Sequence, residues 1–511
     1  MAKKQFFNIM EEQGLALTFD DVRLKTGHCD FRPNEISLET QFSRNVGLHI
    51  PIVSAAMDTV TESEMAIALA KLGGLGVIHY NLSPEDQATE AKRVWHHLNG
   101  RIERPRTVRA NATILEVERE REDHGWTFHS FPVLDTEDRV VGILTRNDFD
   151  FCERKSSRVN EVMTKELVTA RPGTTIDQAY KIMRREKKKV LPLVDNGRRL
   201  VGMYVFSDVQ RIKTGTSSMY NLDEQGHLRC AAAVGIDDDA FERIELLSKY
   251  VSVILINKAH ADFSDYIHTL REIKKKSRPF DVATGNISEG DSAKRLVNAG
   301  SDSIIVGQGG GSICTTRRVA GVGCPQVTAV YNCARAIEGS GVPICADGGI
   351  VFSGDIPIAI GAGAHSVMAG FALAGTKESP GEIKMQEVTV RGASGETIRQ
   401  TVQVKVYRGM GSLEAMQERE GSSARYRQTD LDMKVPEGIK GVVPYKGEVA
   451  IPVYYLVGGL RACMAYVGAR TIPELIRKAD FYRITNAGMT ESNPHDVIML
   501  SEPPNFRRSG A

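Results

Sequence analysis

The sequence has no long apolar run, no paired cysteine motif and almost no net charge. No run approaches the roughly 20 apolar residues that cross a bilayer, and acidic Glu11 and Glu12 stand where a signal peptide would have its apolar core. The 8 cysteines are scattered without CxxC pairs, so the pattern indicates neither a disulfide framework nor a zinc cluster. A formal net charge of +1 does not suggest a nucleic-acid partner. We therefore expect a cytoplasmic protein with reduced cysteines and no membrane or nucleic-acid partner.

The chain does contain enough residues for more than one domain. It has 511 residues, of which 41% are hydrophobic and 25% charged, as in ordinary folded proteins. Eight short apolar runs alternate with helical segments, and each run is predicted to be a buried strand. The eight runs are residues 51–57, 74–79, 229–234, 251–256, 280–284, 303–306, 342–346 and 365–369. Continuous apolar strands that alternate with helices indicate a parallel sheet covered on both sides, and eight of them predict an α/β fold of the closed (β/α)₈ TIM-barrel type.

An internal repeat interrupts the barrel pattern between residues 103 and 216. Residues 131–135, 141–144 and Asp148 recur as 191–195, 201–204 and Asp208 at a constant offset of 60 residues. Two copies at so long a period mean a duplicated supersecondary unit rather than a solenoid. The unit resembles a tandem CBS pair, or Bateman module, and this resemblance implies binding of an adenine or guanine nucleotide and regulation of a neighbouring domain. The alternative is a pair that only packs or oligomerises.

Two details follow from this repeat. Thr145 precedes Asp148 as in nucleotide-binding CBS motifs, whereas Val205 takes that place in the second copy and provides no hydroxyl. The predicted organisation is a catalytic barrel of residues 1–102 and 217–511 with an inserted regulatory domain of residues 103–216.

A glycine-rich loop with a cysteine follows the sixth predicted strand. Residues 307–311 lead into Ser312 and Cys314, and active sites of (β/α)₈ barrels lie at the carboxyl ends of the strands. A cysteine among polar groups can be a nucleophile if its pKa is lowered, and the alternative is a tight turn with an inert buried thiol. Strand seven ends in Asp347-Gly348-Gly349 and strand eight in Gly370, so backbone amides are available for a phosphate. Asp347 is placed to accept hydrogen bonds from a sugar, or alternatively to cap a helix.

Four longer motifs extend this pattern, namely residues 54–62, 311–317, 346–350 and 407–412. With them the chain resembles the IMP dehydrogenase and GMP reductase family over nearly its whole length. The inserted repeat and the segment 421–426, followed by 435–438, resemble the bacterial dehydrogenase branch. The resemblance implies a mobile catalytic flap over residues 417–440.

The resemblance also implies a covalent mechanism. Cys314 as a thiolate would attack C2 of a purine ring and form a covalent intermediate. In a dehydrogenase, hydride then leaves to NAD, a flap with Arg425 and Tyr426 replaces the dinucleotide, and water releases XMP. Arginine is a poor base because its pKa is above about 12, so Tyr426 and Thr316 would assist Arg425.

The family's ligand contacts carry over to matching residues. The implied substrate contacts are Ser54, Met57, Ser312, Asp347, Gly349, Gly370, Tyr407, Met410, Gly411 and Glu437. A monovalent cation, usually potassium, is implied at Gly309, Gly311, Cys314, Glu491, Ser492 and Asn493. The family also implies a homotetramer or octamer.

The departures from the family pattern lie where the dinucleotide should bind. Asn257 and Lys258 stand where the family has Asp and Ser, and Ile305 replaces a basic residue. An amide in place of a carboxylate gives up the stronger, charge-assisted hydrogen bond. The positions that match cofactor contacts are Asn257, Asn286, Gly307 and Gly309.

These departures leave more than one reaction open. The first hypothesis is an IMP dehydrogenase that uses NAD. The alternative is a redox-neutral C2 hydrolase, such as a GMP deaminase, which converts GMP and water to XMP and ammonia. GMP reductase and a non-catalytic regulator are further alternatives. Elsewhere, residues 387–390 and 401–404 predict a short hairpin, and Cys324, Cys333 and Cys345 are interpreted as small buried hydrophobic residues.

Overall fold

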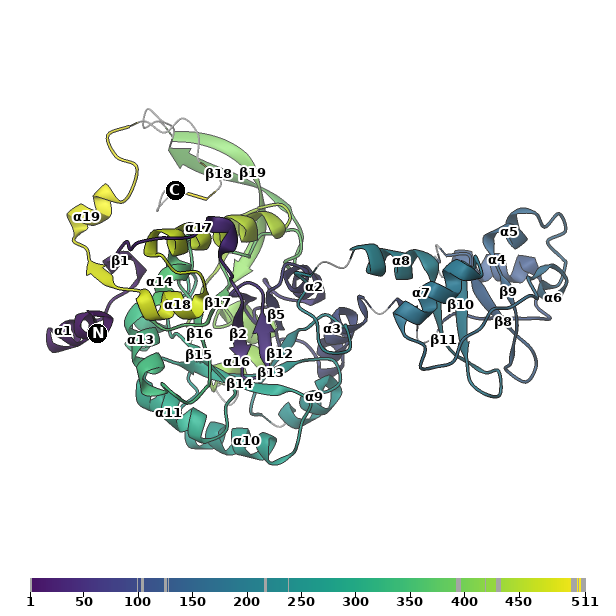
Figure 1. Cartoon of the computed structure of the whole chain (residues 1–511), viewed down its shortest axis with the longest axis horizontal. Helices are drawn as coiled ribbons and strands as arrows, with labels where there is room; N and C mark the ends of the chain where they lie inside the picture. Colours follow the sequence, from purple (N-terminus) through teal and green to yellow (C-terminus); the bar gives the residue numbers. More distant parts are fainter. Residues whose placement is uncertain are drawn as a thin grey trace. The chain divides into compact units, whose positions relative to one another are not determined.

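The chain folds into two compact units, which are described one at a time. One unit comprises residues 1–95 and 219–511, and the other comprises residues 96–218 (Figure 1). The computed structural model describes residues 2–98, 100–102, 105–123, 126, 128–215, 218–237, 239–391, 397–418, 420–428, 433–497, 503 and 505–506.

The larger unit is built on a closed barrel of parallel strands. The barrel strands are β4 (Ile52–Ser54), β5 (Leu75–Ile78), β12 (Ala231–Val234), β13 (Val253–Asn257), β14 (Asp281–Ile287), β15 (Ser303–Val306), β16 (Ile344–Asp347) and β17 (Ser366–Ala369). The circle closes where β17 pairs with β4, with Val367 opposite Ile52. Each of the eight predicted strands corresponds to one barrel strand, so the predicted (β/α)₈ fold is confirmed.

The barrel interior is an apolar core. Val53, Leu75, Leu255, Ala283 and Ile305 share one buried cluster inside the ring of strands. Complete burial of an aliphatic side chain of this size contributes about 1.5–3 kcal/mol. Ile305 therefore lies in the core, where the basic residue that the family pattern has there would be costly to bury.

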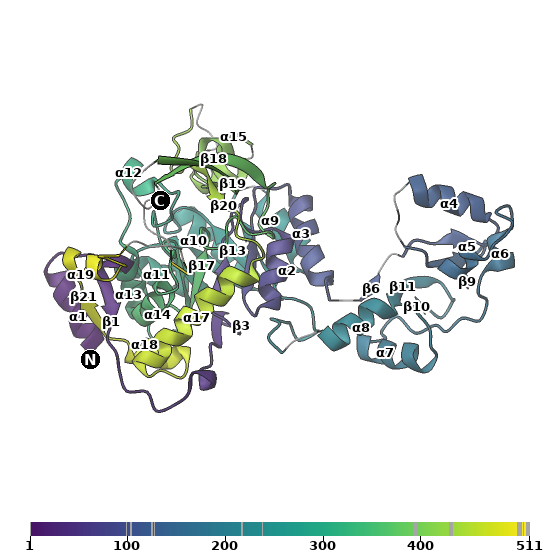
Figure 2. The ribbon, with the colours of Figure 1, turned by 90° about the horizontal axis from the view of Figure 1, so that it is seen from above.

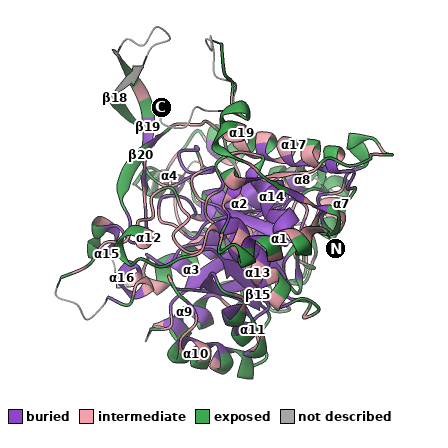
Figure 3. Cartoon of the chain, turned by 90° about the vertical axis from the view of Figure 1, so that its left-hand side faces the viewer, coloured by how far each residue is buried: buried purple, intermediate pink, exposed green. Residues whose placement is uncertain are grey.

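Helices surround the barrel and keep their buried faces toward it (Figures 2 and 3). The helices between barrel strands are α2 (Ser63–Lys71), α3 (Pro84–His96), α9 (Ala240–Leu247), α10 (Ser264–Lys275), α11 (Gly290–Asn298), α12 (Thr316–Val319), α13 (Gln326–Ala336) and α14 (Asp355–Ala362). Additional elements of this unit are α1 (Ala2–Glu12), β1 (Val22–Leu24), β2 (Thr40–Ser43), β3 (Val46–Leu48), α17 (Ala450–Val467), α18 (Ile472–Lys478), β21 (Phe481–Arg483) and α19 (Asn486–Glu491), with 3₁₀ turns at Phe19–Asp21 and Pro33–Glu35.

Helix α17 differs from the sequence-based expectation that no segment is apolar and long enough to cross a membrane. Among the described residues it is the one helix that passes by length and composition, and 28% of that stretch is buried inside the structure. Core helices of soluble proteins pass the same test. In this fold α17 packs on α14 and α18, so its buried side belongs to the barrel unit.

A three-stranded antiparallel sheet stands on the barrel unit. It is formed by β18 (Lys384–Arg391), β19 (Thr397–Arg408) and β20 (Lys440–Pro444). Glu387 lies opposite Thr401, which confirms the predicted hairpin. Strand β19 ends at Arg408 and so leads directly into the 407–412 motif, while β20 follows the end of the flap.

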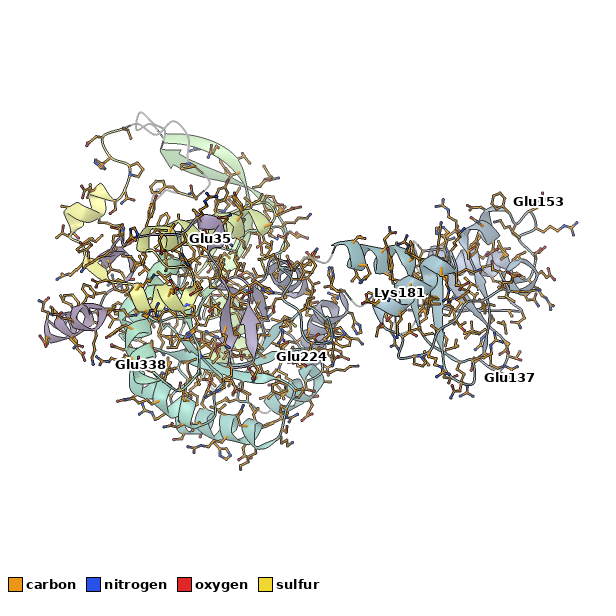
Figure 4. The ribbon with its side chains drawn as sticks, in the orientation of Figure 1. Glu35, Glu137, Glu153, Lys181, Glu224 and Glu338 are labelled. Atoms are coloured by element: carbon orange, nitrogen blue, oxygen red, sulfur yellow. The ribbon has the colours of Figure 1, made fainter. Side chains whose placement is uncertain are left out.

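The smaller unit reproduces the sequence repeat in its strand pairing. Its elements are β6 (Arg101–Ile102), β7 (Val108–Arg109), α4 (Ile114–Asp123), β8 (Phe131–Leu134), β9 (Val140–Leu144), α5 (Arg146–Asp150), α6 (Val159–Val162), α7 (Ile176–Arg185), β10 (Val190–Val194), β11 (Leu200–Val205) and α8 (Phe206–Gly215). Pro132 pairs with Ile143 and Pro192 with Met203, at the same offset of 60 residues. Glu137, labelled in Figure 4, lies in the turn between β8 and β9.

Candidate active site

The cysteine loop begins with a glycine that no other residue could replace. Gly307 follows β15 with a φ of 146°, and a Cβ there would lie 1.9 Å from the backbone oxygen of Asp347. Nearby, the Gln326 side chain donates from Nε2 to the carbonyls of Val306 (2.8 Å) and Asp347 (3.1 Å). The loop is thereby fixed to the carboxyl end of β16.

Cys314 is half-buried and surrounded by polar groups. Its Sγ lies 3.1 Å from the Thr316 hydroxyl and 3.6 Å from the carbonyl oxygen of Glu437. The Thr315 amide donates to the same Glu437 carbonyl at 2.9 Å. Two residues predicted to be catalytic, Cys314 and Thr316, are therefore in direct contact at the carboxyl end of the barrel.

The flap end and the 407–412 motif are joined to this loop by backbone hydrogen bonds. The Ile439 amide donates to the Ile313 carbonyl at 3.0 Å, and the Glu437 amide donates to the Gly411 carbonyl at 2.9 Å. Glu437 and Gly411, two of the predicted substrate contacts, thus lie beside the cysteine loop, with Met410 next to Gly411 in the chain.

Asp347 ends strand β16 and faces the site. Its Oδ2 accepts a hydrogen bond of 2.7 Å from Asn286 Nδ2. Burial raises the pKa of Asp347, and the Asn286 hydrogen bond partly counters that rise. The next helix begins only at Asp355, so the alternative interpretation of Asp347 as a helix cap is wrong.

The other predicted substrate contacts come from several loops at the carboxyl end of the barrel and from strand β19. A Cβ at Gly370 would lie 3.0 Å from the Tyr407 hydroxyl and 3.2 Å from Met57 Sδ, so these three residues are adjacent. A Cβ at Gly349 would lie 3.5 Å from the Gly310 carbonyl of the cysteine loop. Ser312 is exposed on that loop. Ser54 is different, because its hydroxyl is fully buried and accepts a hydrogen bond of 2.8 Å from Thr61.

The described residues of the flap, 417–418, 420–428 and 433–440, lie against the site. Helix α15 (Leu413–Glu418) leads into the flap and α16 (Glu420–Arg425) lies within it. The ring of Tyr426 packs on Gly411 so closely that a Cβ there would meet it at 2.7 Å. The Arg425 guanidinium donates to the side-chain oxygen of Asn257. Arg425 and Tyr426 are thus held on the cysteine side of the barrel.

The electrostatics of the flap keep Arg425 charged. Burial lowers the Arg425 pKa, but Tyr426, Tyr80 and Asp347 outweigh burial and the net pKa is raised. Burial raises the pKa of Tyr426 to about 12. In this arrangement Arg425 is a guanidinium cation and Tyr426 is a neutral phenol at neutral pH.

The predicted cofactor residues bond to other parts of the protein. Besides Asp347, Asn286 donates from Nδ2 to the Gly307 carbonyl at 2.8 Å. Gln308 donates to the Ala259 carbonyl at 2.9 Å and accepts from the Ser288 hydroxyl at 2.8 Å. Gln308 therefore ties the cysteine loop to the loops that follow β13 and β14.

The predicted cation residues are only partly brought together. Gly309, Gly311 and Cys314 share the cysteine loop, whereas Ser492 and Asn493 hydrogen-bond back to Gly488 and Met489 within α19. In the described part of the chain, Glu491, Ser492 and Asn493 make no hydrogen bond to the cysteine loop.

Sequence reasoning missed an ion pair that supports the site. Arg408 Nη2 lies 2.7 Å from Asp58 Oδ2, and both side chains are almost fully buried. Asn81 donates to the same oxygen at 2.9 Å. The pair joins the 54–62 and 407–412 motifs, and the only signal in the sequence was one acid and one base inside two separate motifs.

Comparisons with known proteins agree with this geometry. The family model described as IMP dehydrogenase / GMP reductase domain matches residues 16–495. The chain belongs to the IMP dehydrogenase / GMP reductase family. An inosine-5'-monophosphate dehydrogenase of Halalkalibacterium halodurans is 42% identical over 98% of this chain and 99% of the relative. The Escherichia coli K12 protein of the same name is 44% identical over 96% of this chain and 98% of its own length.

A solved structure of this family is also similar. It is a GMP reductase variant from Trypanosoma brucei in complex with guanosine 5'-monophosphate, with a TM-score of 0.81 and 34% identity over 95% of this chain and 99% of that chain. The family placement accounts for the barrel, the cysteine loop and the Asp347 loop together.

Proposed function

We propose that the chain is an IMP dehydrogenase-type oxidoreductase that converts IMP, NAD and water to XMP and NADH. The observation that carries the proposal is Cys314 at the carboxyl end of the barrel, in contact with Thr316 and close enough to the flap residue Tyr426 for its charge to raise the Tyr426 pKa. Relatives named inosine-5'-monophosphate dehydrogenase, at 42–44% identity over nearly the whole chain, support it.

The mononucleotide is held by the loops around Cys314. Backbone amides at Ser312, Gly349 and Gly370, with the Tyr407 hydroxyl, bind the phosphate, and Asp347 accepts hydrogen bonds from the ribose. The Cys314 thiolate adds to C2 of the purine and forms a carbon–sulfur bond. NAD, when bound, accepts the hydride that leaves C2, and a thioimidate remains on the sulfur.

Hydrolysis of the thioimidate belongs to the flap. Water adds to C2, the carbon–sulfur bond breaks, and XMP leaves while Cys314 is restored as a thiolate. Since Arg425 stays protonated in this arrangement, we assign it to orient the water and stabilise the developing hydroxide. The hydroxyls of Thr316 and Tyr426 pass the water's proton toward solvent.

The dinucleotide residues fit their ligand only after the flap moves. Asn257 and Asn286 would hold NAD with their amide groups, yet the side-chain oxygen of Asn257 now accepts from Arg425. A dinucleotide at Asn257 therefore requires a displaced flap, in keeping with a flap that replaces the dinucleotide during turnover.

A specific observation favours a second function, the redox-neutral hydrolysis of GMP. Asn257 and Lys258, which depart from the family pattern where the dinucleotide should bind, both bond to protein groups, as does Gln308 in the cysteine loop. In this reaction the Cys314 thiolate adds to C2 of GMP, the amine takes up one proton from water, and the carbon–nitrogen bond breaks so that ammonia leaves. Water then releases XMP from the same thioimidate, so no hydride acceptor is needed.

One set of incubations separates these functions. The protein is mixed with IMP or GMP, with and without NAD or NADPH, while reduced-nicotinamide absorbance and XMP are followed. NAD-dependent XMP from IMP supports the dehydrogenase and eliminates the redox-neutral reaction. XMP and ammonia from GMP alone overturn the dehydrogenase. NADPH oxidation with GMP would instead assign a GMP reductase. The absence of turnover in every incubation would indicate a non-catalytic regulator.

We further infer the setting in which this enzyme works. Potassium would be held by carbonyl oxygens of Gly309, Gly311 and Cys314, and a C-terminal segment with Glu491, Ser492 and Asn493 would complete the site from a second copy of the chain. Ile451, Tyr454 and Tyr466 leave an apolar face of α17 exposed, as a homotetramer or octamer would use. The CBS-like unit would bind an adenine or guanine nucleotide, and the enzyme would act in the cytoplasm.

A further inference from the structure

Lys258 is an unusual residue for its place. Only 2% of its side chain is exposed, although lysine is almost never buried unless its charge is paired. Burial lowers the Lys258 pKa, and the hydrogen bond and charge of Asp237 partly restore it. A buried ammonium is costly unless it is paired, so Lys258 depends on its hydrogen-bond partners.

The partners of Lys258 come from two different parts of the barrel unit. Nζ lies 2.8 Å and 3.1 Å from the two carboxylate oxygens of Asp237, in the loop after β12. It also donates at 2.6 Å to the carbonyl of Ala424, in the last turn of flap helix α16. One ammonium thus connects the barrel wall to the flap.

The contact with Ala424 uses the polarity of a helix end. The last carbonyls of a helix have no intrahelical partner and carry partial negative charge, so a cation there is favourable. The adjoining backbone adds a second connection, because the Ala259 amide donates to the Arg425 carbonyl at 3.0 Å. Three successive residues, 257–259, therefore form hydrogen bonds with the end of α16.

We propose that Lys258, paired with Asp237, is a positioning residue that latches the flap in its closed position. The latch holds Arg425 and Tyr426 beside Cys314, where they act on the thioimidate. Its effect on catalysis rests on the proposed C2 chemistry, whereas the latch itself does not. Because the latched flap covers Asn257, the latch must open before a dinucleotide can bind there.

The decisive variant is Lys258→Met in the full chain. Methionine keeps most of the apolar stem and removes the ammonium, and Asp237 is 41% exposed, so water can solvate the carboxylate left behind. Lys275→Met is the matched control, because Lys275 lies on α10 with most of its side chain exposed and forms an ion pair with Glu272 on the same helix. Asp237→Asn is a second variant that weakens the latch without altering the buried stem.

The first measurement is hydrogen exchange of residues 420–428 in the ligand-free protein. We expect Lys258→Met to lose about tenfold or more of the exchange protection there, as hydrogen bonds to a charged group are worth that much, with barrel strands unchanged. Asp237→Asn should lose part of it and Lys275→Met none. Unchanged protection of the flap in both Lys258→Met and Asp237→Asn would overturn the latch.

The second measurement follows the covalent adduct on Cys314 by mass spectrometry of quenched reactions with IMP and NAD, or with GMP. Lys258→Met should accumulate adduct above the unsubstituted chain, with kcat lower by about tenfold and KM for the mononucleotide within about twofold. Equal adduct levels would remove the positioning role. If the unsubstituted chain forms no adduct with either substrate, the proposed function fails, while hydrogen exchange still decides the latch.

Discussion

Polar groups from distant positions in the chain lie around the sulfur of Cys314. Thr316 is two residues away, and the Glu437 carbonyl comes from the flap. The phenols of Tyr426 and Tyr407, from two further parts of the chain, lie close enough for the charge of Cys314 to raise their pKa values. A nucleophile that forms a covalent purine adduct needs this density of polar groups, because each step moves charge between sulfur, ring and water.

Replacement of this sulfur should abolish turnover. Cys314→Ala removes the atom that bonds to C2, so we expect kcat to fall by about a thousandfold or more, with mononucleotide affinity kept within about threefold. Product formation and equilibrium binding of the mononucleotide measure the two effects.

Cys324→Ala is the matched control for the cysteine variant. Burial raises the pKa of Cys324 to about 11, so this neighbouring thiol stays protonated at neutral pH and is not a competing nucleophile. Its variant should keep most of the activity. Turnover by Cys314→Ala above about a tenth of the original rate would contradict covalent catalysis.

At the residue scale, sequence reasoning reaches contacts between near neighbours and misses those that depend on tertiary partners. Cys314 and Thr316 stand two apart in the sequence, so they stay close in space whatever the rest of the fold does. Lys258 and Asp237 are 21 residues apart with no pattern between them. Nothing in composition shows that the ammonium of Lys258 turns inward to the flap.

At the scale of elements, the barrel strands were predictable because complete burial leaves continuous apolar runs. The C-terminal end of β14 was not predictable, because the strand continues to Ile287 through a Gly-Asn pair that breaks the apolar pattern. Helix α16 was also invisible as an element, because Gly421, Ser422 and Ser423 are weak helix formers. Tertiary contacts at Lys258 and Tyr80 stabilise it.

Helix α14 gives the barrel a pH-dependent contribution to stability. Asp355 is the first residue of this helix and is only 7% exposed. Its carboxylate accepts hydrogen bonds from the backbone amides of Val351 (2.8 Å) and Phe352 (2.7 Å). Burial nonetheless raises its pKa from 3.8 to about 6, with Asp20 raising it further and Arg23 lowering it.

The sign of this contribution follows from the raised pKa. Below about pH 4 the carboxyl is protonated in both folded and unfolded chains, so its stabilisation is fully present, and it is lost as the pH rises through about 6. At about 1.4 kcal/mol per pKa unit the loss is roughly 3 kcal/mol. Denaturant unfolding of the original chain and Asp355→Asn at pH 4 to 7 should show their difference in unfolding free energy fall by this order. A constant difference would contradict it.

At the scale of the whole molecule, each unit has its own core. The cluster inside the barrel draws only on residues 42–80 and 231–368, whereas the clusters of the smaller unit lie within residues 108–209. The sequence repeat predicted an insertion at 103–216, and the compact unit spans 96–218. The difference at the first boundary arises because α3 extends to His96, and a helix end is poorly marked where polar residues follow.

The chain leaves the barrel and returns to it on the same patch of surface. Trp95, the last residue before the smaller unit, stacks on His227 with ring centroids 3.7 Å apart. Close to the return point at Met219, the Asn221 amide donates to the Ala70 carbonyl of α2 at 2.8 Å. A short linker between Trp95 and Met219 should therefore replace residues 96–218 without strain on the barrel.

We expect this deletion variant to be soluble, folded and active, with kcat/KM for the mononucleotide within about threefold of the full chain, because among the described residues the core clusters of the two units have no member in common. Any response of the full chain to added adenine or guanine nucleotides should be lost in the variant, since the CBS-like unit would be their site. Circular dichroism, thermal unfolding and steady-state kinetics measure these properties.

The matched control keeps residues 96–218 and carries Val205→Thr. This substitution places a hydroxyl in the second copy of the repeat at the position that Thr145 occupies in the first copy. An insoluble deletion variant would show that the barrel depends on the smaller unit for its fold. A folded but inactive variant would show that the barrel depends on the smaller unit for its activity.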